Sequence, residues 1–254
     1  DWSITYMLQG FIGSTFELEL KLPNGKIKSL NLTHKISEEK ELYPQENNDI
    51  FEYRLLEKDI AYIALNSFTS WDIMGLFSDK LTEIRKAKKL IIDLRKNVSY
   101  YKAIGKYTKA SDTLNNNWSK QSYLTYHDNY YFDFPYNSYK TANMDIERIE
   151  MPTAILIGHN TASASEDFLI YADNQENMTK IGEPTFGSTG QPMIFDLPNG
   201  GIGRVCTKKD TYPDGREFVG YGIKPDIEIK TKLSDYMENR DVVLERAIKH
   251  LNGK

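Results

Sequence analysis

Two serines in the stretch "ILIGHNTASASEDFLIYA", residues 155–172, stand where an apolar run gives way to an amphipathic one. A serine that follows a buried strand and opens a helix places its hydroxyl at the positive end of the helix dipole. Ser163 has that position in the pattern, and the next amide, at Ala164, has no intrahelical partner and can stabilise an oxyanion. Ser163 is therefore a candidate nucleophile for acyl transfer.

A structural interpretation of the same serine stays open. Ser163 with Glu166 three residues later has the spacing of a capping box, in which two side chains satisfy free amides at a helix start. Helix starts rich in serine and threonine are common. The stretch alone therefore fits a helix cap as well as a nucleophile.

The segments around these serines have the patterns of an α/β core. Residues 53–68 predict two strands joined by a tight turn, and residues 71–87 place apolar side chains at helical spacing. The apolar run in 88–97, "KKLIIDLRKN", is typical of a buried parallel strand. Residues 151–158 predict another strand and 165–177 another helix. Strand, helix, strand in this order is a βαβ unit.

Charged residues end the strand predicted in 88–97. Asp93 and Arg95 stand where the following turn begins, and such a pair fixes a turn through hydrogen bonds. We therefore expect both to be structural. Further along, the glycine-rich residues 179–210 are strand-like, and residues 240–251, "RDVVLERAIKHL", predict a final helix.

Residues 1–36 have a different pattern, with apolar and polar side chains alternating on both sides of Asn24 and Gly25. Alternation is the period of a half-buried strand, and Asn-Gly is a strong hairpin signal. A polar, proline-containing linker follows at 37–49. We predict a small separate module before the linker and a main domain over 50–254.

Residues 99–139 contain nine of the 17 tyrosines of the chain. Aromatic side chains with polar tips suit a wet binding surface, so this insertion is either a lid or cleft wall or a decoration packed on the surface.

The composition is that of an ordinary globular protein, with 40% apolar and 27% charged residues. The net charge of −4 argues against a nucleic-acid partner. No apolar run approaches the ~20 residues of a membrane helix, and no signal peptide is recognised. Because the chain begins with Asp1 rather than Met, we expect it to be mature, trimmed or partial.

Metal and redox chemistry have little support in the sequence. The single cysteine, Cys206, excludes an internal disulfide, and its strand-like surroundings "GRVCTKKD" predict a buried thiol. The four histidines are scattered without ligand spacing. We expect no metal and no cofactor, and the sequence indicates no oligomeric state.

Four motifs occur in the order "IIDLRKN", "NTASASEDF", "IGEPTFGSTGQP" and "GYGIKPDIEI". In this combination the chain resembles the S41 serine peptidases from about residue 53 to 229. The resemblance implies an α/β core of the ClpP/crotonase type, a spiral of ββα units. It also implies a peptide or protein substrate and a place in the cell envelope or periplasm. The hairpin in 1–36 resembles the last two strands of a PDZ module.

The resemblance assigns roles within the serine stretch. The family's nucleophile matches Ser163, and one oxyanion donor matches the amide of Ala164. Ser165 and Glu166 then belong to the helix start, with Ser165 expected to cap it.

The general base departs from the pattern of the processing proteases. Their lysine base matches Ser188 in "GEPTFGSTG", and no lysine occurs between Lys180 and Lys208. The tricorn-like branch also lacks this lysine and takes a histidine from an earlier domain. By that resemblance, the base would lie upstream of Asp1.

Two further positions depart from the family. The glutamate of the tricorn-like branch matches Val219, and Glu217 is either its displaced substitute or a solvated strand carboxylate. The glycine pair of the oxyanion region is replaced by Ser99 and Tyr100. Because positive φ is costly for tyrosine, we expect a deformed oxyanion hole.

Two functions follow as hypotheses. The first is a serine endopeptidase that cleaves unstructured peptides or protein tails through a Ser163 acyl-enzyme. The alternative is a catalytically inactive, peptidase-derived protein that binds a peptide or another ligand. The intact serine turn favours the enzyme, and the lost lysine, glutamate and glycine pair favour the binding protein.

Overall fold

Contacts in the computed structural model divide the chain into two units, Asp1–Asn48 with Lys232–Arg240, and Asp49–Thr231 with Asp241–Lys254. Most of the predicted linker lies outside the described residues, so its boundaries stay a prediction. The structure describes residues 10–35, 49–57, 59–68, 72–97, 120–124, 131–134, 149–173, 175–190, 192–212 and 214–253.

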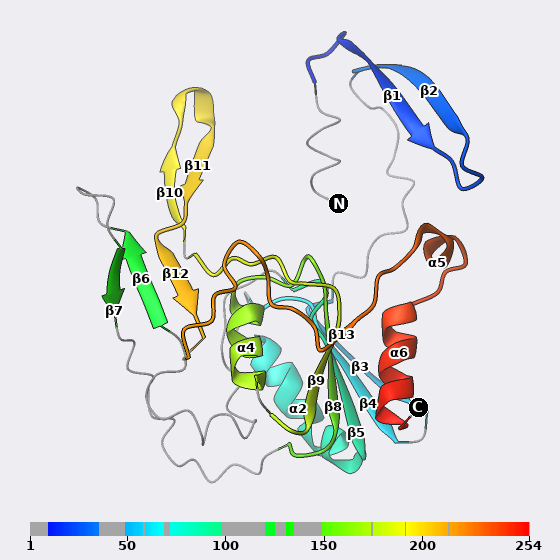
Figure 1. Cartoon of the computed structure of the whole chain (residues 1–254), viewed down its shortest axis with the longest axis vertical. Coiled ribbons are helices and arrows are strands. Elements are labelled where there is room, and N and C mark those ends of the chain that lie inside the picture. The colour runs from blue at the N-terminus through cyan, green and yellow to red at the C-terminus, as the bar shows by residue number, and fades with distance from the viewer. Residues whose placement is uncertain are drawn as a thin grey trace. The chain divides into compact units, whose positions relative to one another are not determined.

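The second unit is a mixed α/β structure built on a six-stranded sheet of order β13-β9-β8-β5-β4-β3 (Figure 1). Only β3 and β4 pair antiparallel in this sheet, and its other neighbours run parallel. β3 and β4 are the two strands predicted in 53–68, and the predicted βαβ order is confirmed. The strands are β3 (Phe51–Leu56), β4 (Ile60–Leu65), β5 (Lys89–Asp93), β8 (Thr153–Ile157), β9 (Met178–Gly182) and β13 (Ile227–Glu228).

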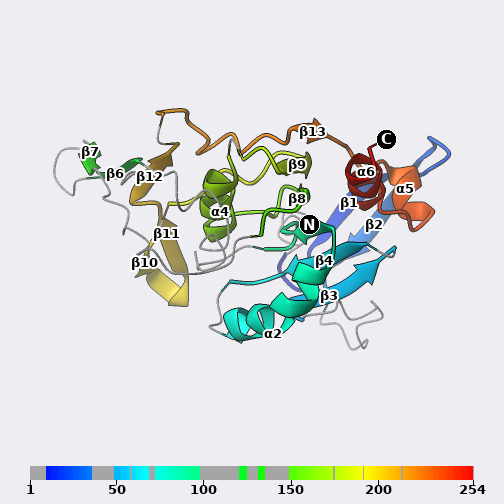
Figure 2. The ribbon, with the colours of Figure 1, turned by 90° about the horizontal axis from the view of Figure 1, so that it is seen from below.

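Helices cover both faces of this sheet. Side chains of α2 (Asp72–Lys86) and α4 (Ala164–Ala172) share one buried cluster with β4, β5 and β8. Side chains of α6 (Val242–Leu251) share a second cluster with the same strands. Figure 2 shows α2 and α6 on opposite sides of β3 and β4. The core is therefore layered helix, sheet, helix.

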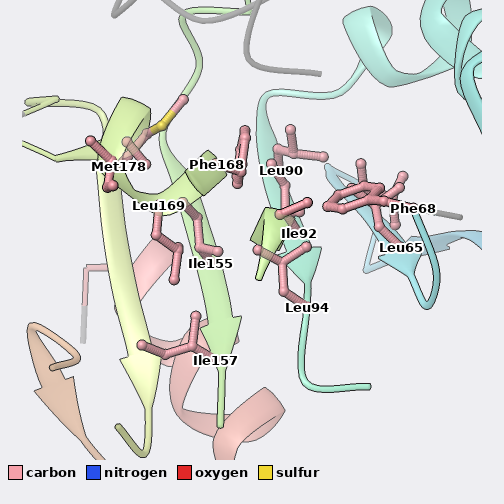
Figure 3. Packing of buried hydrophobic residues seen from close by; sticks show 14 of the residues in the cluster. Leu65, Phe68, Leu90, Ile92, Leu94, Ile155, Ile157, Phe168, Leu169 and Met178 are labelled. Atoms are coloured by element: carbon pink, nitrogen blue, oxygen red, sulfur yellow. The ribbon is translucent and has the colours of Figure 1, made fainter. Parts of the chain in front are cut away.

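The apolar runs of the central strands explain this layering. Every residue of β4 and of β8 is buried, so both faces of each strand need a cover. Alternate residues divide between the clusters: Ile92 and Ile155 belong to the cluster with α2 and α4, and Ile91 and Leu156 belong to the cluster with α6. Phe168 and Leu169 of α4 lie against β5 and β8 in Figure 3.

A charged network links the end of β5 to the start of α6. The Arg95 guanidinium donates to Asp93 Oδ2 at 2.6 Å and to Asp241 Oδ2 at 2.7 Å. Tyr62 also donates to Asp93 Oδ2, at 2.9 Å, and Asp241 caps α6 by accepting from the Leu244 amide at 3.0 Å. Asp93 and Arg95 thus have the structural contacts expected of them.

The remaining elements lie outside the six-stranded sheet. The first unit holds the hairpin β1 (Thr15–Lys21) and β2 (Ile27–Thr33) together with α5 (Leu233–Met237). The second unit holds the hairpin β10 (Met193–Asp196) and β11 (Ile202–Val205), joined by η2 (Pro198–Gly200). In a three-stranded sheet, β6 (Lys120–Leu124) pairs with β12 (Lys208–Thr211) on one side and with β7 (Tyr131–Phe134) on the other.

Three predictions from the sequence can be compared with this part of the structure. The predicted insertion at 99–139 contributes β6 and β7, and the rest of it lies outside the described residues. The prediction that Cys206 is buried in a strand was wrong, because Cys206 lies between β11 and β12 and is exposed. Within the described ranges, no helix has the length and apolar character to cross a bilayer.

Replacing Arg95 by alanine should lower the free energy of unfolding by about 2–3 kcal/mol, because buried Asp93 would lose its cation. Chemical denaturation of both proteins measures this loss. Lys88→Ala is the matched control, since its pair with Asp59 is exposed and should contribute less than about 1 kcal/mol. Equal effects of the two substitutions would contradict a structural role for Arg95.

Asp241 gives the network a dependence on pH. Burial raises the pKa of Asp241, but the hydrogen bonds and the charge of Arg95 lower it by more. The pKa of Asp241 in the folded protein therefore lies below its ordinary value. Its stabilisation is then complete above about pH 4 and is lost as the pH falls through the folded pKa. Asp241→Asn keeps a capping oxygen without the charge. The stability gap between wild type and Asp241→Asn should therefore shrink from pH 7 to about pH 3; a constant gap would contradict this.

Candidate functional site

The site lies where the central parallel strands end. Asp93 pairs with Leu156, and Ile157 pairs with Gly182, so the segments that follow β5, β8 and β9 leave the same edge of the sheet. Ligand sites in parallel sheets occur at such edges. The serine stretch is one of these three segments.

A tight turn brings the chain from β8 to the serine. The Thr161 amide donates to the Gly158 carbonyl at 2.8 Å, and the Gly158 amide donates to Thr161 Oγ1 at 3.0 Å. Thr161 Oγ1 in turn donates to the Leu94 carbonyl at 2.9 Å, which ties this turn to the end of β5. Thr161 is fully buried, so the approach to Ser163 is fixed from inside.

Ser163 is the N-cap residue of α4, with φ 58° and ψ −119°. A positive φ is costly for any residue other than glycine, and such strain typically amounts to ~1–3 kcal/mol. The side chain is half-buried. The predicted place of Ser163 at the start of a helix is confirmed, in a conformation that the pattern alone did not indicate.

The carboxylate of Glu166 organises the surroundings of Ser163. Its Oε1 accepts from Thr185 Oγ1 at 2.6 Å and from the Gly187 amide at 2.7 Å. Its Oε2 accepts from the Ser188 amide at 2.9 Å and from the Ser163 amide at 3.1 Å. Glu166 is fully buried, so these four donors replace its water. The glutamate half of the capping box is thus part of a larger junction.

Burial raises the pKa of Glu166 above its ordinary value, and the four donors oppose that shift. The direction of the hydrogen bond between Thr185 and Glu166 follows from the other contact of Thr185. Its Oγ1 accepts from the Ile223 amide at 2.6 Å, so its own proton is free to point at Glu166. Three of the four contacts come from amides that can only donate, which favours a carboxylate acceptor.

Ser188 lies beside Ser163 through its backbone. The Ser163 amide donates to the Ser188 carbonyl at 2.9 Å as well as to Glu166. The Ser188 amide donates to Glu166 at 2.9 Å. The structure therefore brings together Ser163 and the position that matches the family's lysine.

Two glycines allow the loop 185–188 to pack against residues 218–222. Gly222 has φ +80°, and a Cβ there would lie 2.1 Å from the Thr185 carbonyl oxygen. Gly187 has φ +81°, and a Cβ there would lie 2.6 Å from the Gly222 nitrogen. Any side chain at either position would separate the two loops. This packing brings the motif around Ser188 into contact with "GYGI".

Asn97 holds the other side of the serine turn. Its carbonyl accepts from the Ala162 amide at 3.0 Å and from Ser165 Oγ at 3.3 Å. The expectation that Ser165 caps α4 was therefore wrong: Ser163 is the N-cap residue, and Ser165 is buried against Asn97. Ser99 and Tyr100, the predicted oxyanion region, lie outside the described residues.

The amide of Ala164 is the first of α4. Within the described part of the chain it donates to no acceptor, as expected for a first helical residue. With the positive end of the helix dipole behind it, this amide is suited to bind a developing negative charge beside Ser163.

Glu217 is exposed, and its carboxylate accepts from Lys209 Nζ at 2.8 Å. It forms an isolated bridge with Thr211 and belongs to no regular strand, while Val219 packs against the core. Glu217 and Val219 therefore do not share a face of a regular strand. No contact between Glu217 and Ser163 is seen, and a catalytic role for Glu217 stays a prediction.

The described residues contain no group of three or more His, Cys, Asp or Glu side chains arranged to hold a metal.

Sequence reasoning missed Glu166 as the centre of the site and assigned it only to the helix start. The signal for its partners, 19 to 22 residues away, lay in the "GEPTFGS" motif.

Comparison with known proteins gives consistent matches. A Carboxy-terminal-processing protease of Bartonella bacilliformis is 33% identical over 107 residues, 41% of this chain and 25% of that protein. A Carboxyl-terminal-processing protease of Picosynechococcus sp. is 26% identical over 222 residues, 86% of this chain and 50% of that protein. A solved structure from Parabacteroides merdae, described as a peptidase, has TM-score 0.61 and 24% identity, covering 79% of this chain and 64% of that one.

The chain spans a quarter to half the length of these two curated relatives. The solved structure shares the fold. The family model described as Peptidase family S41 matches residues 59–229, which include Ser163, Glu166 and the loop 185–188. Because this match covers more than half of the chain, the chain belongs to peptidase family S41.

Proposed function

We propose that this protein is a serine endopeptidase that cleaves unstructured peptides or protein tails with Ser163 as its nucleophile. The observation that carries the proposal is the strained backbone of Ser163, held at the start of α4 by Glu166 and Ser188. Strained residues cluster at active sites, where the surroundings fix a reactive geometry. Action in the cell envelope or periplasm belongs to the same proposal, through the family resemblance.

In this mechanism, Ser163 Oγ forms a bond to the scissile carbonyl carbon while a general base takes its proton. The carbonyl oxygen becomes an oxyanion beside the Ala164 amide. When the intermediate collapses, the peptide C–N bond breaks, and the amine takes a proton and leaves. Water then hydrolyses the acyl-enzyme and restores Ser163. Ser188 replaces the family's lysine, so we assign the base to a residue outside the described chain.

A second function is an inactive protein that binds peptides in the same place. Two observations favour it. The position that matches the family's lysine holds Ser188, and the Glu217 carboxylate is paired with Lys209. A fluorophosphonate probe separates the two functions, because only an activated serine reacts covalently.

Ser163→Ala should abolish peptide hydrolysis and probe labelling while changing the melting temperature little, because no cap hydrogen bond of the Ser163 side chain is lost. Ser163→Gly should be equally inactive yet more stable by about 0.5–1 kcal/mol, because glycine accepts the positive φ. Calorimetry and hydrolysis of an unstructured protein measure both effects. If Ser163→Ala instead loses about 1 kcal/mol and keeps its turnover, the serine is only a helix cap.

Glu166→Gln should lower the free energy of unfolding by about 2–4 kcal/mol and suppress labelling of Ser163. One carboxylate oxygen becomes an NH2 group, which then opposes donors from the loop 185–188 or from Ser163. Denaturation and probe labelling provide the measurements. Glu183→Gln, on the same loop and half-buried, is the control, with less than about 0.5 kcal/mol expected. Similar behaviour of both variants would contradict the central role of Glu166.

A further inference from the structure

Phe186 is unusual in the loop that surrounds Ser163. Every other residue from Ile181 to Gly190 is buried or half-buried, whereas the Phe186 side chain is 54% exposed. Its two neighbours, Thr185 and Gly187, are bound to the Glu166 carboxylate. A large aromatic ring is therefore presented to solvent from a firmly held loop.

The backbone of Phe186 is fixed relative to the serine turn. Its amide donates to the Thr161 carbonyl at 3.0 Å, two residues before Ser163. Ser188, which follows two residues after Phe186, accepts from the Ser163 amide. Since consecutive Cα atoms are about 3.8 Å apart, the Phe186 Cα lies within about 8 Å of the Ser188 Cα. Phe186 thus belongs to the immediate rim of the serine site.

His159 extends this aromatic surface. It occupies the tip of the turn between β8 and Ser163 and is exposed. Its ring lies 5.4 Å from that of Phe186, at an interplanar angle of 51°, within the range of favourable aromatic pairs. The two rings come from the segments that follow β8 and β9, the same two that bring Ser163 and Ser188 together.

We propose that His159 and Phe186 form the wall of a substrate subsite that selects an apolar or aromatic side chain next to the scissile bond. The proposal rests on the assignment of Ser163 as the nucleophile. An extended peptide rises only ~3.3 Å per residue, so a residue next to a carbonyl placed at Ser163 would lie close to the loop that carries Phe186. An exposed aromatic surface gains most from covering apolar groups.

The test compares peptides that carry leucine, phenylalanine, serine or aspartate at one position beside the cleaved bond. Wild type should favour leucine and phenylalanine, and Phe186→Ala should reduce that preference in kcat/KM by about 10-fold. Leu55→Ala removes another exposed apolar side chain, on β3, and should keep the preference. An unchanged preference in Phe186→Ala would overturn the proposal.

Substitutions at His159 separate a wall from a general base. His159→Phe retains an aromatic ring and should retain the preference for leucine and phenylalanine, whereas His159→Ala should weaken that preference. If His159→Phe abolishes labelling although the protein is folded, the histidine takes part in the chemistry, and the wall proposal fails for it.

A binding measurement keeps the subsite testable if Ser163 never reacts. Fluorescence anisotropy of the same labelled peptides with Ser163→Ala measures affinity without turnover. The subsite is supported if Ser163→Ala binds the leucine and phenylalanine peptides more tightly and the double variant with Phe186→Ala does not. This result would support the subsite even if a lack of probe labelling had refuted the peptidase function. Equal affinity for all four peptides would overturn the subsite itself.

Discussion

The described part of the site depends on one buried carboxylate. Glu166 has no exposed surface, and an unpaired buried charge would cost several kcal/mol. Its donors come from both sides of the site: the serine turn supplies one, and the loop 185–188 supplies three. Thr185 extends the contact to Ile223. One charge therefore holds together three segments that are distant in sequence, and the position of Ser163 follows from that requirement.

Much of the main fold could be predicted from local patterns. The apolar run in 88–97 predicted a buried parallel strand, which is β5, and the helical spacing in α2 matches the burial of Ile73, Phe77 and Ile84. Helical spacing was less informative for Leu76, which is 39% exposed. Periodicity identifies the face of a helix, but the width of the contact depends on the strands that it meets.

The site was predicted less completely, because its contacts are between distant residues. Ser163 at the start of α4 was predicted from the pattern, since strand, turn and helix are local. The junction at Glu166 could not be derived in this way, because its partners include amides, which any residue type provides. The same reason explains the error over Ser165, whose acceptor is the carbonyl of Asn97 in another segment. Cys206 was assigned to a strand that ends one residue earlier.

The contacts of Ser188 show that its backbone, and not its side chain, holds the site together. Both of its contacts in the site are made by the backbone, so the junction does not require a lysine or any other particular side chain there. The serine turn can therefore form without a lysine at this position. Ser163 is different, because glycine would adopt its positive φ at lower cost. Since no cap hydrogen bond of its side chain compensates for that cost, the presence of a serine supports a use for the hydroxyl beyond folding.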